Sequence, residues 1–168
     1  MDEIANAVER ATAYLGEHPS EASYRDSEAR ARLTDGLRVE VTGPGGERTT
    51  TDMPSGIGGS ASAPSPGWYM RAAAASCVAA LIGIRAATLG IELAPGSVEV
   101  TVDSASDDRG ILGIDDSISA GALSLKVVVT ITADAGRPAL EALARWALNH
   151  CPVTDTIQRS VPIELEVR

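Results

Sequence analysis

Two cysteines and two histidines are the side chains of this 168-residue chain best suited to nucleophilic or redox chemistry. Cys77 lies within an uncharged, alanine-rich stretch, and Cys151 lies between His150 and a proline. A free thiol is only a few per cent thiolate at neutral pH and needs a nearby cation to become a good nucleophile. Composition alone favours two inert, buried thiols. Their positions favour a reactive pair, because small residues around Cys77 would admit a small substrate and Cys151 sits at a helix break where local movement is cheap.

Other chemistries receive less support. Two isolated histidines and two distant cysteines do not supply the paired ligands of a zinc site, and we expect no metal or other cofactor. A cysteine hydrolase would pair Cys77 with His18 or His150, but a histidine at a helix end more often interacts with the carbonyl dipole there. The glycine-rich loop at 54–66 lacks the Gly-Lys-Ser/Thr signature of a phosphate-binding loop and is better explained as a connection or the wall of a ligand site.

The stretch from Pro66 to Gly90 predicts the helix around which the rest of the chain is organised, either as one long helix or as two abutting ones. Ser65 suits the N-cap position, the proline suits the first helical position, and Gly90 suits the left-handed residue beyond the end. No charged residue lies between Arg71 and Arg85. The helix is therefore expected to be buried on most of its faces.

The remaining pattern indicates an α+β arrangement. An amphipathic helix at 3–15 and a linker form an accessory segment, residues 1–27, ahead of a domain at 28–168. A second helix begins at Pro138 and ends before Pro152. A turn is expected at 107–110, followed by an irregular segment or a short strand at 111–120. Strands are expected at 29–33, 37–41, 48–53, 98–103, 123–132 (a central strand) and 163–167. Turn signals at 34–36 and 43–46 join the first three strands into an antiparallel meander.

Charge and composition exclude several classes of partner. The net charge of −9 repels nucleic-acid backbones and anionic membranes, and an aromatic content of 3% offers few platforms for stacking bases. The uncharged run at 72–84 is shorter than the roughly 20 residues of a membrane span. The N-terminus is acidic, unlike that of a signal peptide. A cytoplasmic protein with two thiols at rest is therefore expected.

Four short motifs together resemble the OsmC/Ohr family, the osmotically inducible protein C and organic hydroperoxide resistance proteins. They are Asp52-Met53-Pro54 followed by Gly58-Gly59, the helix from Pro66 to Cys77, Asp107-x-Arg109-Gly110-x-x-Gly113, and His150-Cys151-Pro152-Val153. The resemblance spans residues 29–168. It implies an OsmC-like α+β fold in which antiparallel-rich sheets pack around long central helices of an intertwined homodimer.

The resemblance also implies a function, that of a thiol-dependent peroxidase acting on organic hydroperoxides or hydrogen peroxide. By position, Cys77 would attack the peroxide and become a sulfenic acid, and Cys151 would resolve it as a disulfide. A dithiol, lipoyl or similar, would reduce that disulfide. The step from sulfenic acid to disulfide is ordinary thiol chemistry.

An arginine from an early strand stabilises the thiolate in this family, and Arg38 matches it best, with Arg30 and Arg32 as rivals. In the organic hydroperoxide resistance branch, a glutamate after the helix-starting proline pairs with that arginine. This chain has Gly67 at that position. The departure leaves an alternative open, a non-enzymatic homodimer that binds a small ligand in the same interface pocket without efficient peroxidase activity.

Overall fold

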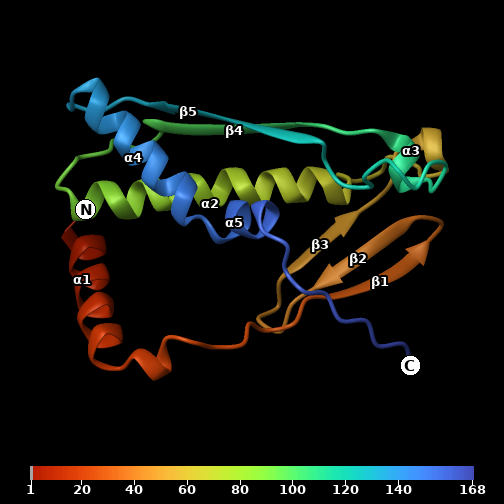
Figure 1. The fold of residues 1–168 in the computed structure, drawn as a ribbon, viewed down its shortest axis with the longest axis horizontal. Coiled ribbons are helices and arrows are strands. Elements are labelled where there is room, and N and C mark those ends of the chain that lie inside the picture. Colours follow the sequence, from red (N-terminus) through yellow and green to blue (C-terminus); the bar gives the residue numbers. More distant parts are fainter. Residues whose placement is uncertain (1) are drawn as a thin grey trace. The chain divides into compact units, whose positions relative to one another are not determined.

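The structure, a computed structural model, describes residues 2–168. It divides into two compact units, one formed by residues 71–168 with the start of the chain, and the other by residues 11–70. Figure 1 labels the elements of both units.

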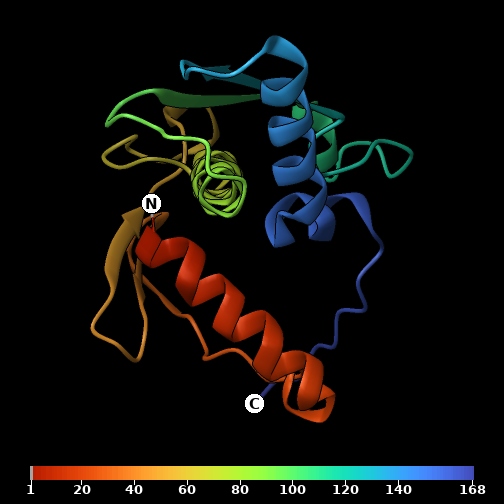
Figure 2. The ribbon, with the colours of Figure 1, turned by 90° about the vertical axis from the view of Figure 1, so that its left-hand side faces the viewer.

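The larger unit contains both cysteines, one within a long helix and the other at the break between two shorter helices. The long helix α2 begins in the smaller unit. It is a single helix, which was one of the two alternatives predicted for this stretch. The elements in chain order are α2 Pro66–Thr88, β4 Val98–Ala105, α3 Asp108–Ile111, β5 Ser124–Ile131, α4 Arg137–His150 and α5 Pro152–Gln158. In the end-on view of α2 in Figure 2, the β4–β5 sheet covers one side of the helix and α4 lies beside it.

The core of this unit lies where α2 meets α4. One stripe of α2 is completely buried. It consists of four residues spaced four apart: Ala74, Val78, Ile82 and Ala86. Leu143 and Ala147 of α4 pack in the same cluster. Partly buried side chains of β4 and β5 close it from the sheet side. Burial is the dominant favourable term in folding, so this cluster is what fixes α4 against α2.

The prediction that α2 is buried on most faces is wrong for the single chain. Its buried positions form one stripe, while the small residues Ala73, Ser76 and Ala80 on other faces are exposed. The reason is that the other elements of the larger unit cover only one side of the helix. By length and composition, α2 could cross a membrane, a test that the core helix of a globular domain also passes. Its buried stripe is that of a core helix.

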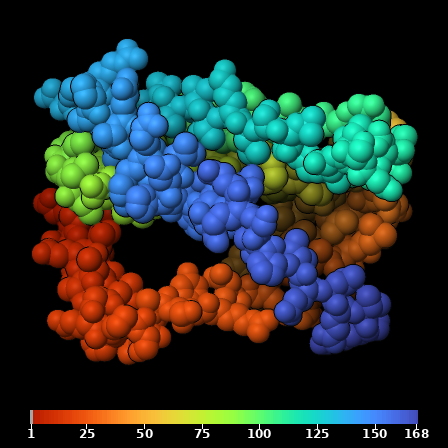
Figure 3. All heavy atoms as spheres, in the orientation of Figure 1, coloured from red at the N-terminus to blue at the C-terminus, as the bar shows by residue number. Residues whose placement is uncertain are grey.

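Strands β4 and β5 form an antiparallel ladder in full register, from Val98 opposite Ile131 to Ala105 opposite Ser124. Burial alternates along both strands, as expected for a sheet with one face on the core. The β5 segment is not a central strand in this chain, because its sheet has two strands only. Side chains of β5 and α4 also lie against one another at the surface (Figure 3).

The smaller unit confirms the predicted antiparallel meander. Three strands pair in sequence order, and a helix predicted at 3–15 spans two further residues at its end. The elements are α1 Asp2–Glu17, which begins in the larger unit, then η1 Pro19–Glu21, β1 Arg30–Asp35, β2 Arg38–Thr42, β3 Arg48–Thr51 and η2 Ser55–Ile57. β1 is exposed along its whole length.

The start of α2 is built as the sequence predicts. The Trp68 amide donates to the side chain of Ser65 at 3.2 Å, so the serine caps the helix. Gly90 follows its end with φ +67°, a left-handed conformation that glycine adopts without steric cost.

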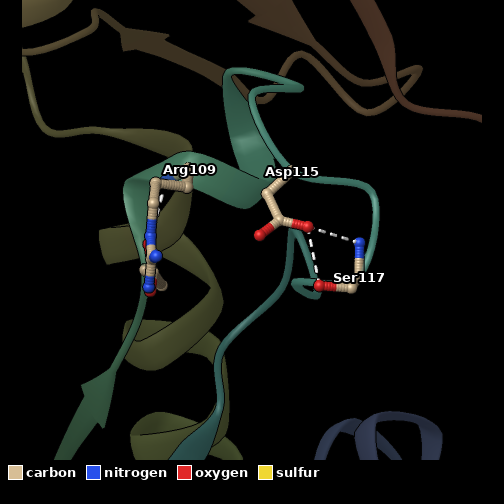
Figure 4. Close-up of polar contacts among 4 residues, drawn as sticks. Arg109, Asp115 and Ser117 are labelled. Atoms are coloured by element: carbon tan, nitrogen blue, oxygen red, sulfur yellow. Dashed lines mark hydrogen bonds and ion pairs between the residues drawn. The ribbon is translucent and has the colours of Figure 1, made fainter.

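The turn predicted at 107–110 is instead a cap followed by one helical turn, α3. The Asp107 carboxylate accepts from the amide of Arg109 at 3.0 Å and pairs with its guanidinium at 2.5 Å. The segment after α3 is irregular, which was one of the two alternatives predicted for residues 111–120. There Asp115 accepts from both the amide and the hydroxyl of Ser117 (Figure 4). A Cβ at Gly110 would overlap the backbone at Ser119, so only glycine fits there.

Two features near the C-terminus differ from expectation. Helix α5 was not predicted, and residues 163–167 were predicted as a strand but make no strand pairing in the part of the chain that the structure describes. The apolar side chains of this segment are open to solvent, with Ile163 93% and Leu165 88% exposed. A strand needs a neighbour to satisfy its amides and carbonyls, and within residues 2–168 this segment has none.

Candidate active site

The two cysteines, far apart in sequence, come together at the junction of α2 and α5. Cys77 lies on α2 beside the buried stripe and is half-buried, while Cys151 is completely buried in the core cluster. Cys77 packs against the cluster that contains Cys151, and each thiol shifts the pKa of the other. Of the two thiols, Cys77 is the one open to a small molecule from solvent.

The position of Cys151 follows from the break between α4 and α5. The proline after it cannot continue α4, and it occupies the first position of α5, where its missing N–H is not needed. Cys151 is the N-cap of α5, and its Sγ accepts from the Thr154 amide at 3.5 Å. The buried Thr154 hydroxyl donates to the carbonyl of Leu148 at 2.9 Å and also contacts that of Cys151 at 3.2 Å. These bonds tie the second cysteine to the end of α4.

The surroundings shift the pKa values of the two thiols in opposite directions. Burial raises the pKa of Cys77, and its hydrogen bond to Cys151 raises it further. Burial also acts to raise the pKa of Cys151, but the Thr154 amide and the interaction with Cys77 outweigh it and lower that pKa. The Val153 amide favours both thiolates. A raised pKa disfavours the Cys77 thiolate, and a nearby positive group would favour it.

Arg38, the predicted source of that charge, belongs to the smaller unit. It begins β2, is half-buried, and its Nη1 donates to the Ser62 hydroxyl at 2.8 Å. The rivals are placed differently on β1, because Arg30 pairs with Glu28 at 2.6 Å in an exposed ion pair and Arg32 is exposed. Among the three predicted site residues, the structure therefore brings together Cys77 and Cys151.

The structure reveals a buried carboxylate, Asp52, that the sequence placed in a motif but to which it assigned no role. Asp52 is 2% exposed and accepts four hydrogen bonds. The donors are the Ser60 hydroxyl at 2.6 Å, the Ser62 hydroxyl at 2.8 Å, the Ser62 amide at 2.9 Å and the Met53 amide at 2.8 Å. Led by that of Ser60, they hold the pKa of Asp52 well below its usual range. The signal available in the sequence was an aspartate ahead of a serine-rich loop.

The family model described as OsmC-like protein matches residues 59–166, which include both cysteines. The chain belongs to the OsmC-like family. Among proteins with curated descriptions, none matches this chain.

Solved structures of the family share the fold of this OsmC-like chain. An OsmC-like protein from Mycoplasma pneumoniae is 14% identical with a TM-score of 0.67, covering 81% of this chain and 89% of its own. An organic hydroperoxide resistance protein OsmC from Legionella pneumophila is 21% identical with a TM-score of 0.60, covering 81% and 91%. The protein OhrB of Bacillus subtilis, of the same description, is 18% identical with a TM-score of 0.53, covering 87% and 100%. The α+β, OsmC-like fold predicted from the sequence is confirmed.

Both histidines of this OsmC-like chain are used at helix ends. The ring of His150 donates to the Trp146 carbonyl at 2.8 Å and stacks on that indole, with ring centroids 4.2 Å apart. His18 donates in the same way to the Tyr14 carbonyl at 2.9 Å. Each ring thus satisfies a carbonyl of its own helix, as predicted for His150. Within residues 2–168, no three His, Cys, Asp or Glu side chains are placed to share a metal ion.

Proposed function

We propose that this protein is a thiol-dependent peroxidase that reduces organic hydroperoxides or hydrogen peroxide, with Cys77 as the attacking thiol and Cys151 as the resolving thiol. The observation that carries the proposal is the contact between a solvent-accessible thiol and a buried one. The names of the Legionella and Bacillus relatives, both organic hydroperoxide resistance proteins, support the substrate class.

The reaction would proceed in three steps. The Cys77 thiolate attacks the outer oxygen of the peroxide, the O–O bond breaks, and the leaving alkoxide takes a proton to become an alcohol, while the sulfur is oxidised to a sulfenic acid. Cys151 then attacks the sulfenic sulfur, forming the disulfide and releasing water. A dithiol, lipoyl or similar, returns both cysteines to thiols and is itself oxidised to a disulfide.

The lowered pKa of Cys151, caused by the Thr154 amide and the Cys77 hydrogen bond against the effect of burial, suits the second step. A lower pKa gives a resolving thiol a larger thiolate fraction, and the thiolate is the nucleophile. The first step needs help, because burial and Cys151 raise the pKa of Cys77. We assign that help to Arg38, whose charge would favour the thiolate by direct pairing.

A homodimer is part of the proposal. The apolar α2 is covered on one side only, and the extended segment 163–167 leaves its apolar side chains exposed within this chain. A second copy would cover both. The proposed site of action is the cytoplasm, where dithiol reductants keep such thiols reduced.

The test is consumption of cumene hydroperoxide or hydrogen peroxide in the presence of a dihydrolipoyl donor. Cys77→Ser is expected to abolish it. Cys151→Ser is expected to allow a single oxidation, trapped as a sulfenic acid by dimedone. Turnover that survives Cys77→Ser would exclude the mechanism.

The alternative function, a dimer that binds a small ligand without turning over peroxide, is favoured by Gly67 and by the raised pKa of Cys77, which burial and Cys151 cause. Mass spectrometry after one equivalent of peroxide separates the two. A Cys77–Cys151 disulfide supports the peroxidase, and two unmodified thiols support the binding protein.

A further inference from the structure

We propose that the exposed face of the β1–β2–β3 sheet binds the phosphate group of a small soluble molecule. The group would be held between Arg30 of β1 and Arg48 of β3, over the hydroxyl of Thr42. These residues all belong to the smaller unit. The inference goes beyond the peroxidase function proposed above, because the site uses neither cysteine.

The register of the sheet places these three side chains in one row. Thr42 of the middle strand lies opposite Arg30 on one side and opposite Arg48 on the other. Residues directly opposite one another in an antiparallel sheet point to the same face. Two strand spacings separate the Cα atoms of the two arginines by about 10 Å, so both guanidinium groups can reach one small group above Thr42.

Two clefts meet at Thr42, which lines both of them. The first has a volume of about 210 Å³ and includes Arg48 in its lining. The second has a volume of about 310 Å³ and includes Arg30 and Glu28. Each cleft thus contains one arginine of the row, and the shared threonine supplies a hydroxyl that can donate to an anion.

The opposite face of the sheet is already occupied within the smaller unit. The Tyr69 hydroxyl, from the start of α2, contacts the Thr49 hydroxyl and donates to the Thr50 carbonyl at 3.2 Å. Thr49 comes directly after Arg48 on β3, and successive strand residues point to opposite faces. The arginine row therefore lies on the face away from the start of α2, and both of its arginines are exposed.

Both arginines of the row are available to an anion. Within residues 2–168, the guanidinium of Arg48 forms no hydrogen bond or ion pair. Arg30 pairs with Glu28 at 2.6 Å, but the two side chains are 71% and 73% exposed, and such a pair contributes little stability. Guanidinium groups suit phosphate, because each donates two parallel hydrogen bonds and a phosphate group has oxygens enough for two arginines and a hydroxyl.

The nearby carboxylates limit the affinity of the site but do not fill it. Glu28 is the competitor, since it pairs with Arg30. The carboxylate of Glu47 lies where a side chain on Gly43 would stand, which is on the opposite side of the chain from Thr42. Charges farther than about 8 Å are largely screened at physiological salt, so the net charge of −9 acts mainly against extended polyanions.

The experiment titrates inorganic phosphate into the full-length reduced protein at constant ionic strength and follows the backbone amides by NMR. Saturable shifts are expected at Arg30, Thr42 and Arg48, with a dissociation constant on the order of 1 mM. Acetate, which has only two oxygens, should bind at least about tenfold more weakly. Shifts that do not saturate, or an equal affinity for acetate, would overturn the inference.

Substitutions on the same face separate a site from a general effect of charge. Arg48→Gln should weaken phosphate binding about tenfold, because it removes charge-assisted hydrogen bonds. Arg32→Gln removes the same charge one row away, opposite Glu40, and should stay within about threefold of the wild type. Glu28→Gln should strengthen binding about twofold, since it releases Arg30. Equal losses in the two arginine variants would overturn the inference, and the amide spectrum of each variant shows that it is folded.

Two further probes distinguish the sources of the phosphate group. Glycerol phosphate should bind about as tightly as inorganic phosphate, because a monoester leaves three oxygens free to accept. Vesicles of phosphatidylcholine with phosphatidic acid should not retain the protein, since an anionic bilayer repels a chain with a net charge of −9. Retention on these vesicles that Arg48→Gln abolishes would overturn the assignment to a small soluble molecule.

Discussion

Cys77 packs against the core cluster that contains Cys151, and Cys151 is itself the N-cap of helix α5. This relationship sets the resting state of the pair. Against the effect of burial, the Thr154 amide lowers the pKa of Cys151, whereas burial and the neighbouring Cys151 raise the pKa of Cys77. Four predictions test this arrangement and the elements that support it.

Cys151→Ala should make Cys77 more reactive toward an alkylating agent. Burial and the hydrogen bond to Cys151 raise the pKa of Cys77, and the substitution removes the second cause. The fraction of thiolate at pH 7 should rise roughly three- to tenfold, and the alkylation rate with it. Iodoacetamide kinetics check this, with Cys151→Ser, which keeps a polar acceptor, as the intermediate case. A slower reaction in Cys151→Ala would show that Cys151 does not hold the Cys77 proton.

Asp52→Asn should reduce the dependence of the free energy of unfolding on pH at acidic pH. Hydrogen bonds from Ser60 and Ser62 depress the pKa of Asp52 in the folded protein. A depressed pKa adds stability above the unfolded value, about 3.9, and that stability is lost as the pH falls toward the folded value. Urea unfolding of the wild type should therefore weaken below about pH 4, and the variant should lose this part of the dependence. Asp134→Asn, at an exposed aspartate, is the control and should behave like the wild type.

Thr154→Val should destabilise the junction of α4 and α5. The hydroxyl of Thr154, which is 6% exposed, donates to the Leu148 carbonyl at 2.9 Å, and valine leaves that carbonyl without its partner. A loss of about 1–2 kcal/mol in the free energy of unfolding is expected. Denaturant unfolding measures it against Thr156→Val, an exposed position on the same helix. Equal effects at both threonines would mean that the hydroxyl contributes no stability.

Ile163→Asp should weaken association of two chains while leaving each chain folded. Ile163 is 93% exposed in the single chain, so a charge there costs little unless another chain covers the residue. Sedimentation velocity should show a wild-type dimer that dissociates in this variant at concentrations where Glu164→Gln does not. A wild type that sediments as a monomer would contradict the proposed dimer.

The sequence alone determined the elements whose signals are local. Ser65 and Gly90 mark the two ends of α2, and alternation of apolar and polar residues marks the paired strands. The turn at Gly36 and the one near Gly46 likewise predicted the meander of β1, β2 and β3, because left-handed glycines join neighbouring strands. The family resemblance, and with it the fold, rested on the same kind of short, ordered signal.

What the sequence could not determine depends on contacts between distant residues. It offered two thiols but not their contact, since the packing of α2 against α4 and α5 brings Cys77 to Cys151. It offered Asp52 and Ser62 as neighbouring polar residues, and only the folded loop joins Ser62 to Asp52 and to Arg38. A strand at 163–167 was expected from its alternation, but pairing requires a neighbour that local pattern cannot supply. Local propensity acts over a few residues, whereas the state of a thiol or the order of an arginine is set by whichever groups the tertiary fold places beside it.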